Sequence, residues 1–410
     1  MPKQSERTNV IWAKNKFYGH KSNSQELKFF RQDEIDKAYM FQKSHSLFNE
    51  TPLHQLKNLA HYLNVQDIRV KDESYRFGLN AFKVLGGIFA VGKCLANKLG
   101  KNIEDLSFEA LKESKDELGE LTFISATDGN HGRGVAWAAR ELGHKSVIYM
   151  PKGSSLHRLE AISDEGAEAY IIDLNYDDAV RKCAQLSDEH GWIMVQDTAW
   201  EGYEEIPLWI MQGYGAMGKE IVDQLKKEEE QPPTHVFLQA GVGSYAAGVT
   251  AYLTQYYSDQ PPAVIIVEPD QADCYYRSFS NPSGIRTTVS GDMNTIMAGL
   301  ACGEPNTIAF NILRQYAKGA FSCKDQVASL GMRIYGNPLK GDPKVISGES
   351  GAVTLGLLHE LQKNEAYLTI REELSLNSQS RILLINTEGD TDPDHYLEIV
   401  WKGLHSNIDQ

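Results

Sequence analysis

The chain has 410 residues, of which 41% are hydrophobic and 23% charged, and its formal net charge is −14. This composition is that of a soluble globular protein, long enough for two lobes around one cleft. The acidic balance excludes nucleic acid as a partner, because binding a phosphate backbone needs a basic face. A membrane is excluded as well, since no apolar run approaches the roughly 20 residues of a membrane span. The polar segment Met1–Gly19 lacks the apolar core of a signal peptide.

The five cysteines are widely spaced and include no Cys-x-x-Cys pair. An odd number of scattered cysteines predicts reduced thiols, a cytoplasmic location and no zinc or other metal site. The spacing leaves a single bridge open, such as one between Cys274 and Cys302.

The first chemically distinctive residue along the chain is Lys83, in the segment Phe77–Gly87. It stands among Phe82, Val84 and Leu85 at the front of a predicted helix. Because burial disfavours a charged ammonium, a lysine in this apolar setting is expected to lose its proton easily and to act as an amine nucleophile. The alternative is that Lys83 reaches solvent from an ordinary helix.

From Glu120 onwards strands and helices alternate with short links, which predicts a parallel sheet. The predicted strands are Leu121–Ser125, Ser146–Met150, Ala169–Asp173 and Trp192–Asp197, and the predicted helices are Gly134–Leu142, Leu156–Glu165 and Tyr176–His190. A second set of strands is predicted at His235–Gln239, Ala263–Glu268 and Arg381–Asn386. Its distance from the first set in the sequence indicates a separate sheet, so the predicted fold class is α/β.

The segment Thr122–Gly134 is predicted to be a strand, a polar loop and the start of a helix. Asp128 and Asn130 follow the end of the strand, the edge at which open α/β sheets bind their ligands. The unpaired N–H groups at the start of a helix suit an anionic group. The simpler alternative is a turn in which Asp128 caps the helix.

The segment Val236–Gly248 is an apolar strand that runs into a glycine-rich turn and then a helix. Such a turn cradles phosphate with backbone N–H groups. The residues Gly241, Gly243 and Ala246 also match a variant of the dinucleotide fingerprint, and Glu268 stands about where a ribose-binding acid is expected. This segment alone therefore leaves a nicotinamide-dependent oxidoreductase open.

A last buried strand ends in Thr387-Glu-Gly-Asp390. With the segments around Lys83, Asp128 and Gly241, it resembles the fold-type II pyridoxal-phosphate enzymes, the group of threonine and serine dehydratases and the tryptophan synthase β chain. Four motifs are similar to those of the diaminopropionate ammonia-lyases: Ala126–Arg133, Asp197–Tyr203, Thr295–Pro305 and Thr387–Asp392. The resemblance runs in order from Thr51 to beyond Asp392.

The resemblance implies two lobes, each with a mainly parallel sheet flanked by helices. Residues 1–86 and 206–410 would form a large cofactor-binding domain, with residues 87–205 inserted as a small domain. Lys83 would then lie where the chain crosses from one lobe to the other, with the cofactor between the lobes.

The resemblance also implies pyridoxal phosphate as the cofactor and Lys83 as its Schiff-base lysine. The phosphate cradle would be formed by Gly241, Val242, Gly243 and Ser244. Asn130 would bond the ring hydroxyl, Thr387 would face the ring nitrogen, and Glu349 would lie near the ring. A neutral threonine hydroxyl is a weak counter-ion, which favours elimination over transamination.

The implied reaction is the α,β-elimination of D- or L-2,3-diaminopropionate to pyruvate and two ammonia. Asp128 stands where the dehydratases usually have serine, and a carboxylate there suits a substrate with a second ammonium or acts as a base. Asp197 is assigned to the same ammonium or to positioning Asp128. Candidates for the substrate carboxylate are Thr127 and the backbone N–H groups from Gly129 to His131.

A serine or threonine dehydratase of the same fold is the alternative within the family. In either case the expected ligand is a small amino acid, and the expected assembly is a homodimer.

Overall fold

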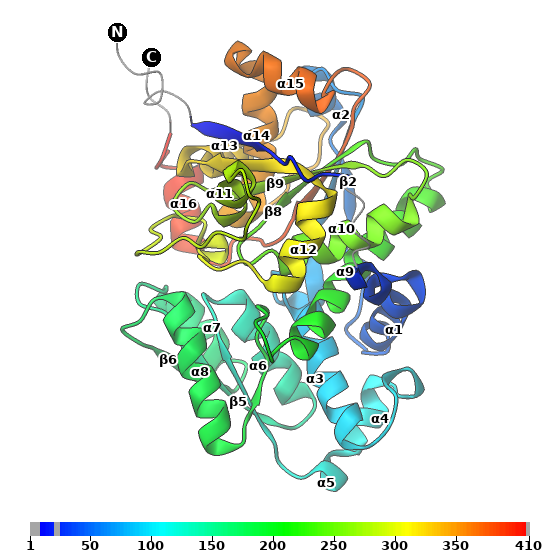
Figure 1. Ribbon diagram of the computed structural model, residues 1–410, viewed down its shortest axis with the longest axis vertical. Coiled ribbons are helices and arrows are strands. Elements are labelled where there is room, and N and C mark those ends of the chain that lie inside the picture. Colours follow the sequence, from blue (N-terminus) through cyan, green and yellow to red (C-terminus); the bar gives the residue numbers. More distant parts are fainter. Residues whose placement is uncertain (1–8, 20–24, 407–410) are drawn as a thin grey trace.

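The computed structural model describes residues 9–19 and 25–406, and these residues form two sheets (Figure 1). In the described part of the chain, the larger sheet has the strand order β1-β10-β9-β8-β11-β3-β2 and the smaller one β6-β5-β4-β7. Pairing is parallel throughout except at the two edges of the larger sheet, where β1 and β2 are antiparallel to their neighbours. The predicted α/β class with two mainly parallel sheets is confirmed. The segment Met1–Gly19, in which the sequence indicates no signal peptide, lies partly outside the described residues.

The elements have the following bounds. The larger sheet contains β1 (Val10–Lys14), β2 (Leu53–Gln55), β3 (Asp67–Asp72), β8 (His235–Gln239), β9 (Ala263–Pro269), β10 (Ala317–Cys323) and β11 (Arg381–Asn386), and the smaller one contains β4 (Thr122–Ala126), β5 (Lys145–Met150), β6 (Glu168–Ile171) and β7 (Ile193–Met194). The helices are α1 (Gln32–Lys43), α2 (Lys57–Tyr62), α3 (Val84–Lys98), α4 (Phe108–Glu113), α5 (Lys115–Leu118), α6 (Asn130–Glu141), α7 (Leu156–Ser163), α8 (Tyr176–His190), α9 (Glu205–Lys227), α10 (Ser244–Tyr256), α11 (Cys274–Ser280), α12 (Thr307–Tyr316), α13 (Asp325–Gly336), α14 (Glu349–Lys363), α15 (Leu368–Leu374) and α16 (Pro393–Val400). Among the described helices, none is both long and apolar enough to cross a membrane.

Helix α6 begins earlier than its apolar pattern predicts, at Asn130 rather than at Gly134. The reason is a polar contact that periodicity does not show. The Thr127 hydroxyl accepts the N–H of Gly132 at 3.0 Å and so satisfies a donor of the first turn. The polar loop residues from Asn130 onwards can therefore be helical.

Helix α3 joins the two lobes, because it packs on α6 of the small-sheet lobe and on α9 (Figure 1). Glycine allows both contacts. A Cβ at Gly134 of α6 would lie 2.9 Å from Val84 Cα, and one at Gly213 of α9 would lie 2.4 Å from Leu85 O. These close approaches fix the start of α3, where Lys83 is the N-cap residue.

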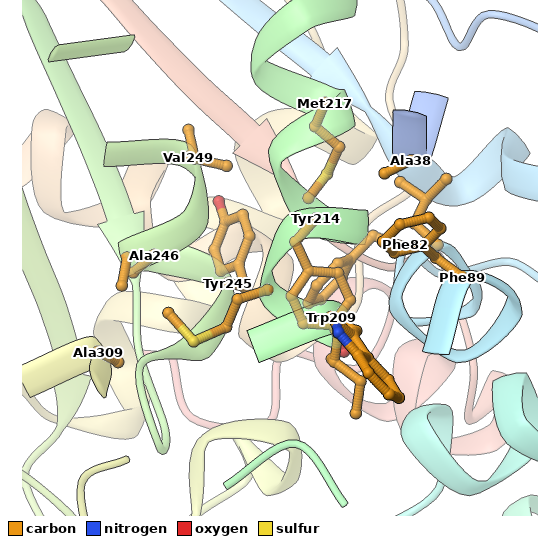
Figure 2. Close-up of a cluster of buried hydrophobic side chains, with 14 of the residues drawn as sticks. Ala38, Phe82, Phe89, Trp209, Tyr214, Met217, Tyr245, Ala246, Val249 and Ala309 are labelled. Carbon is orange, nitrogen blue, oxygen red and sulfur yellow. The ribbon is translucent and has the colours of Figure 1, made fainter. Parts of the chain in front are cut away.

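Aromatic side chains fill the space between the start of α3 and the helices α9 and α10. Figure 2 shows Phe82 together with Tyr214 of α9 and Tyr245 of α10 in one buried cluster. The Phe82 ring centroid lies 4.9 Å from that of Tyr214 and 4.8 Å from that of Tyr245. Because Phe82 directly precedes Lys83, its packing on α9 and α10 fixes the backbone at Lys83.

A fully buried group of charges links β3 to α9. Glu220 lies 2.7 Å from Lys71 Nζ and 2.8 Å from Arg76 Nη1, and Arg76 also pairs with Glu73 at 2.8 Å. The side chains of all four residues are 0% exposed. Because buried charges are tolerated only in pairs, this cluster constrains the segment that leads from β3 to Lys83.

All five cysteines are free and buried. The bridge between Cys274 and Cys302 that the sequence leaves open is therefore not formed.

We predict that Glu220→Gln destabilises the fold by about 3–5 kcal/mol, because it leaves Lys71 and Arg76 buried with one carboxylate between them. The matched control is Glu228→Gln at the end of α9, since Glu228 is 47% exposed in its pair with Arg69 and should contribute about 0–1 kcal/mol. Urea unfolding of the two variants measures the difference. Equal losses of stability would show that the buried cluster contributes no more than a surface pair.

Candidate active site

The carboxyl ends of strands from both sheets meet at one cavity. From the smaller sheet, the loop after β4 contributes Thr127 and Asp128 and the segment after β7 contributes Asp197. From the larger sheet, the turn after β8 contributes Gly241 to Ser244 and the segment after β11 contributes Thr387. Of the residues predicted from the sequence, the cavity is lined by Lys83, Thr127, Asp128, Asn130, His131, Asp197, Gly241, Val242, Gly243, Ser244 and Thr387. This is the edge at which parallel sheets bind ligands.

Lys83 and Asp197 form a buried ion pair in this cavity. Lys83 Nζ lies 2.5 Å from Asp197 Oδ2, and the two side chains are 16% and 2% exposed. The other oxygen, Asp197 Oδ1, accepts a hydrogen bond from Tyr176 Oη at 3.3 Å. Asp197 therefore has both oxygens engaged, and its neighbour is Lys83 rather than Asp128.

The ion pair changes the proton affinity of both groups. Burial lowers the pKa of Lys83, but the carboxylates of Asp197 and Asp128 outweigh it and hold the pKa well above its ordinary value. Burial raises the pKa of Asp197, and the Lys83 ammonium reverses this and lowers the pKa to about 2. The expectation that burial alone makes Lys83 lose its proton easily is wrong, because the sequence pattern does not show the carboxylate beside it.

Asp128 is held differently. Its Oδ2 lies 3.4 Å from Arg158 Nη1, whereas Oδ1 has no hydrogen bond to any residue that the structure describes. The alternative that Asp128 caps helix α6 is wrong, because the N-cap residue is Gly129 and the side chain that accepts an N–H of the first turn is that of Thr127. The loop is shaped instead by Thr127, whose hydroxyl accepts the N–H of Gly129 at 2.9 Å.

This contact changes the expected carboxylate site in the loop. The Gly129 N–H is engaged by Thr127 and Gly129 does not line the cavity, so the N–H groups of Asn130 and His131 are the better candidates. They open helix α6, where N–H groups have no partner within the helix. The His131 ring contacts the backbone, with Nε2 at 2.8 Å from Val195 O. Burial lowers the pKa of His131, which favours its neutral form.

The glycine-rich turn after β8 has the shape of an anion cradle. Gly243 has φ +89°, and a Cβ there would lie 2.0 Å from Tyr275 Oη, so the position admits glycine alone. Helix α10 begins at Ser244, directly after this turn, and points its first N–H groups toward the cavity end of the strand. The Ser244 hydroxyl donates to the backbone oxygen of Asp197, which ties the turn to the smaller sheet.

Glu268 is not available for a ribose. Its carboxylate is buried and accepts the backbone N–H groups of Tyr275 at 2.8 Å and Tyr276 at 2.7 Å, at the start of α11. Burial raises the pKa of Glu268 to about 8. The dinucleotide interpretation of the Gly241–Ala246 segment therefore lacks its acidic residue.

The cavity contains polar groups that sequence analysis misses. Gln239 Nε2 donates to Thr387 Oγ1 at 2.9 Å, which leaves the Thr387 hydroxyl hydrogen for another acceptor. Among the described residues, Gln239 Oε1, Tyr214 Oη and Ser350 Oγ are buried without a hydrogen-bond partner. Because buried polar atoms are costly to leave unpaired, these atoms suit a polar ligand in the cavity. Gln239 and Tyr214 lie within apolar runs, so sequence periodicity marks them as core.

Asn130 is held by Glu388, which the sequence analysis did not select. Asn130 Nδ2 donates to Glu388 Oε2 at 2.5 Å, and Glu388 Oε1 accepts the N–H of Ser350 at 3.2 Å. Burial raises the pKa of Glu388. The available signal was its place beside Thr387 in the same motif. Glu349, by contrast, does not line the cavity, and its Oε1 pairs with His395 Nδ1 at 2.5 Å in a neighbouring cavity.

Comparison with known proteins shows the family to which this chain belongs. The model of the family described as "Pyridoxal-phosphate dependent enzyme" matches residues 46–371. Diaminopropionate ammonia-lyase of Escherichia coli (strain K12) is 52% identical over 394 residues, which cover 96% of this chain and 97% of that protein. The chain belongs to the diaminopropionate ammonia-lyase family. Its cofactor is accordingly pyridoxal phosphate, and the anion cradle and unpaired polar atoms fit that group.

Solved structures of this family have the same fold. The Escherichia coli diaminopropionate ammonia-lyase in complex with D-serine superimposes with a TM-score of 0.90 at 49% identity, covering 97% of this chain and 98% of that one. The same enzyme in complex with an aminoacrylate-PLP azomethine reaction intermediate gives a TM-score of 0.88 at the same identity and coverage. The lyase assignment is therefore favoured over the dehydratase and oxidoreductase alternatives.

We predict that Asp197→Asn lowers the pKa of Lys83, because burial then acts without the carboxylate that opposes it. An amine attacks an aldehyde only without its proton, so the rate of cofactor binding by the apo protein rises with pH. In the variant, the pH at which the rate of cofactor binding rises should be lower by about 1–3 pH units. Visible absorbance after mixing with pyridoxal phosphate measures the rate. The control is Asp178→Asn on α8, a 48% exposed carboxylate, and an unmoved profile in Asp197→Asn would contradict the ion-pair effect.

Proposed function

We propose that this chain eliminates ammonia from 2,3-diaminopropionate. With one water, the substrate gives pyruvate and two ammonia. The observation that carries the proposal is Asp128, a carboxylate with one free oxygen in the same cavity as Lys83. The dehydratases usually have serine at this position, and a carboxylate suits a substrate whose β-substituent is an ammonium. The diaminopropionate ammonia-lyase of Escherichia coli, at 52% identity, supports the same substrate.

The residues that would hold pyridoxal phosphate are those that line the cavity. Lys83 Nζ binds the aldehyde carbon, and the backbone from Gly241 to Ser244 binds the phosphate. Asn130 bonds the ring hydroxyl, and the Thr387 hydroxyl, oriented by Gln239, donates to the ring nitrogen. When bound, the cofactor supplies an electron sink for negative charge at the substrate Cα.

Glu349 does not lie where it could contact the cofactor ring, because it is not among the residues that line the cavity. Its carboxylate pairs with His395 outside the cavity, whereas Glu388 lines the cavity and holds Asn130. Glu388 is therefore the acidic residue that we assign to the neighbourhood of the ring.

Two groups of the chain can accept the α-proton. The Lys83 amine is one, once the substrate amine has replaced it on the cofactor, and the free oxygen of Asp128 is the other. The C–N bond at Cβ then breaks, its electron pair leaves on nitrogen as ammonia, and the three-carbon enamine product hydrolyses to pyruvate and a second ammonia. Asp197 stabilises the Lys83 ammonium between these events.

The assembly and location are part of the same proposal. We infer a cytoplasmic homodimer in which residues 87–205 form a small domain inserted in the large domain of residues 1–86 and 206–410. The free, buried cysteines support a reducing compartment. The division into domains is supported by the separate sheets, since β4 to β7 all lie between residues 122 and 194.

The substrate assignment predicts faster turnover of diaminopropionate than of serine or threonine. A carboxylate at position 128 attracts the second ammonium of diaminopropionate, whereas serine and threonine offer it a neutral hydroxyl. Pyruvate from diaminopropionate and serine, and 2-oxobutyrate from threonine, should be measured at equal substrate concentrations. Turnover of serine at the same rate as diaminopropionate would refute the assignment of Asp128 to specificity.

Two bases on two sides of Cα predict that D- and L-diaminopropionate are both substrates. We expect Asp128→Asn to slow one enantiomer, the D form, about 10²–10⁴-fold more than the other, because a positioned base contributes about that much. Cofactor absorbance should be retained. The ratio of kcat/KM for the two enantiomers is the measurement, since loss of ammonium binding would slow both. Equal slowing would leave Asp128 as a binding residue and rule out the second base.

A further inference from the structure

Arg158 of helix α7 is a buried arginine, 7% exposed, that spans the two lobes. Its Nη1 lies 3.4 Å from Asp128 Oδ2, in the loop after β4 of the smaller sheet. Its Nη2 lies 3.4 Å from Thr391 Oγ1, in the segment after β11 of the larger sheet. The guanidinium therefore connects the loop that carries Asp128 to the segment that carries Thr387 and Glu388.

The stem of Arg158 lies against the peptide next to Asp128. A Cβ added to Gly129 would lie 2.9 Å from Arg158 Cδ, and Gly129 has φ +154°. A side chain at position 129 would displace the arginine. Arg158 thus contacts both the backbone of the loop and the carboxylate that the loop carries, so its contacts limit the orientations open to Asp128.

The charges around Arg158 leave Asp128 as its direct partner. Despite burial, the carboxylates of Glu388, Asp128, Glu349 and Asp392 raise the pKa of Arg158. Three of these already have other hydrogen bonds: Glu388 with Asn130, Glu349 with His395, and Asp392 with the N–H of His395. The guanidinium approaches only Asp128 within ion-pair distance in the described structure.

We propose that Arg158 is a positioning residue that acts through Asp128. By holding Oδ2 on the side of the neighbouring cavity, which both residues line, it fixes the carboxylate and leaves Oδ1 free for the substrate Cα. Arg158 itself does not line the cavity with Lys83, so it does not touch the reacting atoms. This inference rests on the proposed function, in which Asp128 takes the α-proton of one enantiomer.

A double-mutant cycle tests the inference, with Arg158→Met, Asp128→Asn and the double variant as holoenzymes. The substrate is the diaminopropionate enantiomer that Asp128→Asn slows more. We expect Arg158→Met alone to lower kcat/KM about 10–100-fold, because a misplaced catalytic group costs about that much. In the Asp128→Asn background the same change should cost less than about threefold, since coupled residues are not additive. Arg158→Lys, which keeps the charge, should recover part of the loss.

Two further measurements separate positioning from folding. Thermal unfolding midpoints and cofactor absorbance of the variants should match those of the wild type. The matched control is Arg140→Met at the far end of α6, a 43% exposed arginine in ion pairs of its own, which should leave kcat/KM unchanged. If Arg158→Met lowers the unfolding midpoint or loses cofactor, the double-mutant cycle is run with Arg158→Lys instead. The smaller loss of kcat/KM that Arg158→Lys causes must then disappear in the Asp128→Asn background.

The outcomes are distinct. Losses that multiply in the double variant, or no loss in Arg158→Met alone, would overturn the role of Arg158 while wild-type turnover leaves the proposed function intact. Failure of the wild type to release pyruvate from either enantiomer would refute the proposed function and the role of Arg158 with it.

Discussion

The buried ion pair between Lys83 and Asp197 is the contact on which the site depends. Lys83 precedes helix α3, which packs on both lobes, and Asp197 follows the last strand of the smaller sheet. Because neither charge is stable in the interior alone, the pair ties the start of α3 to the segment that follows β7. The same pair raises the pKa of Lys83 and so favours its ammonium form. The cavity therefore lies where the start of α3 meets the segment after β7.

Two aspartates in one cavity differ because their surroundings differ. Asp197 is almost fully buried with both oxygens engaged, whereas Asp128 is held through one oxygen and keeps the other free. The first arrangement stabilises a cation, and the second presents a proton acceptor. Environment rather than residue type separates such roles. Arg158 and Glu388 shape the surroundings of Asp128 and Asn130 and belong to the same network.

The sequence predicts those strands and helices whose apolar residues follow a regular pattern. Strands β8 and β11 and helix α8 have the bounds expected from their apolar runs. Strand β3 is not predicted because three of its six residues, Arg69, Lys71 and Asp72, are charged yet buried, and a charged residue does not look like a core position in the sequence. Strand β10 was missed because it is made largely of small residues, with a glycine at Gly319.

The site residues also fall into those that a sequence motif marks and those that it does not. Lys83, Asp128, Asn130, Asp197 and the glycine-rich turn could be selected because each stands in a local motif at a strand end or a helix start. Arg158 and Gln239 could not, because their importance comes from contacts with residues 30 and 148 positions away. Glu388 stands beside Thr387 in a motif, but its contact with Asn130, 258 positions away, is what gives it a role. The proton affinity of Lys83 was misjudged for the same reason, since Asp197 lies 114 positions away.

We expect Lys83, at the junction of the two lobes, to be the residue that carries pyridoxal phosphate. Borohydride reduction of the purified holoenzyme, followed by proteolysis and mass spectrometry, tests it directly. The expected result is a yellow protein whose cofactor becomes fixed on the peptide containing Lys83 and on no other lysine peptide. A cofactor fixed on a different lysine, or a protein that takes up no pyridoxal phosphate, would contradict it.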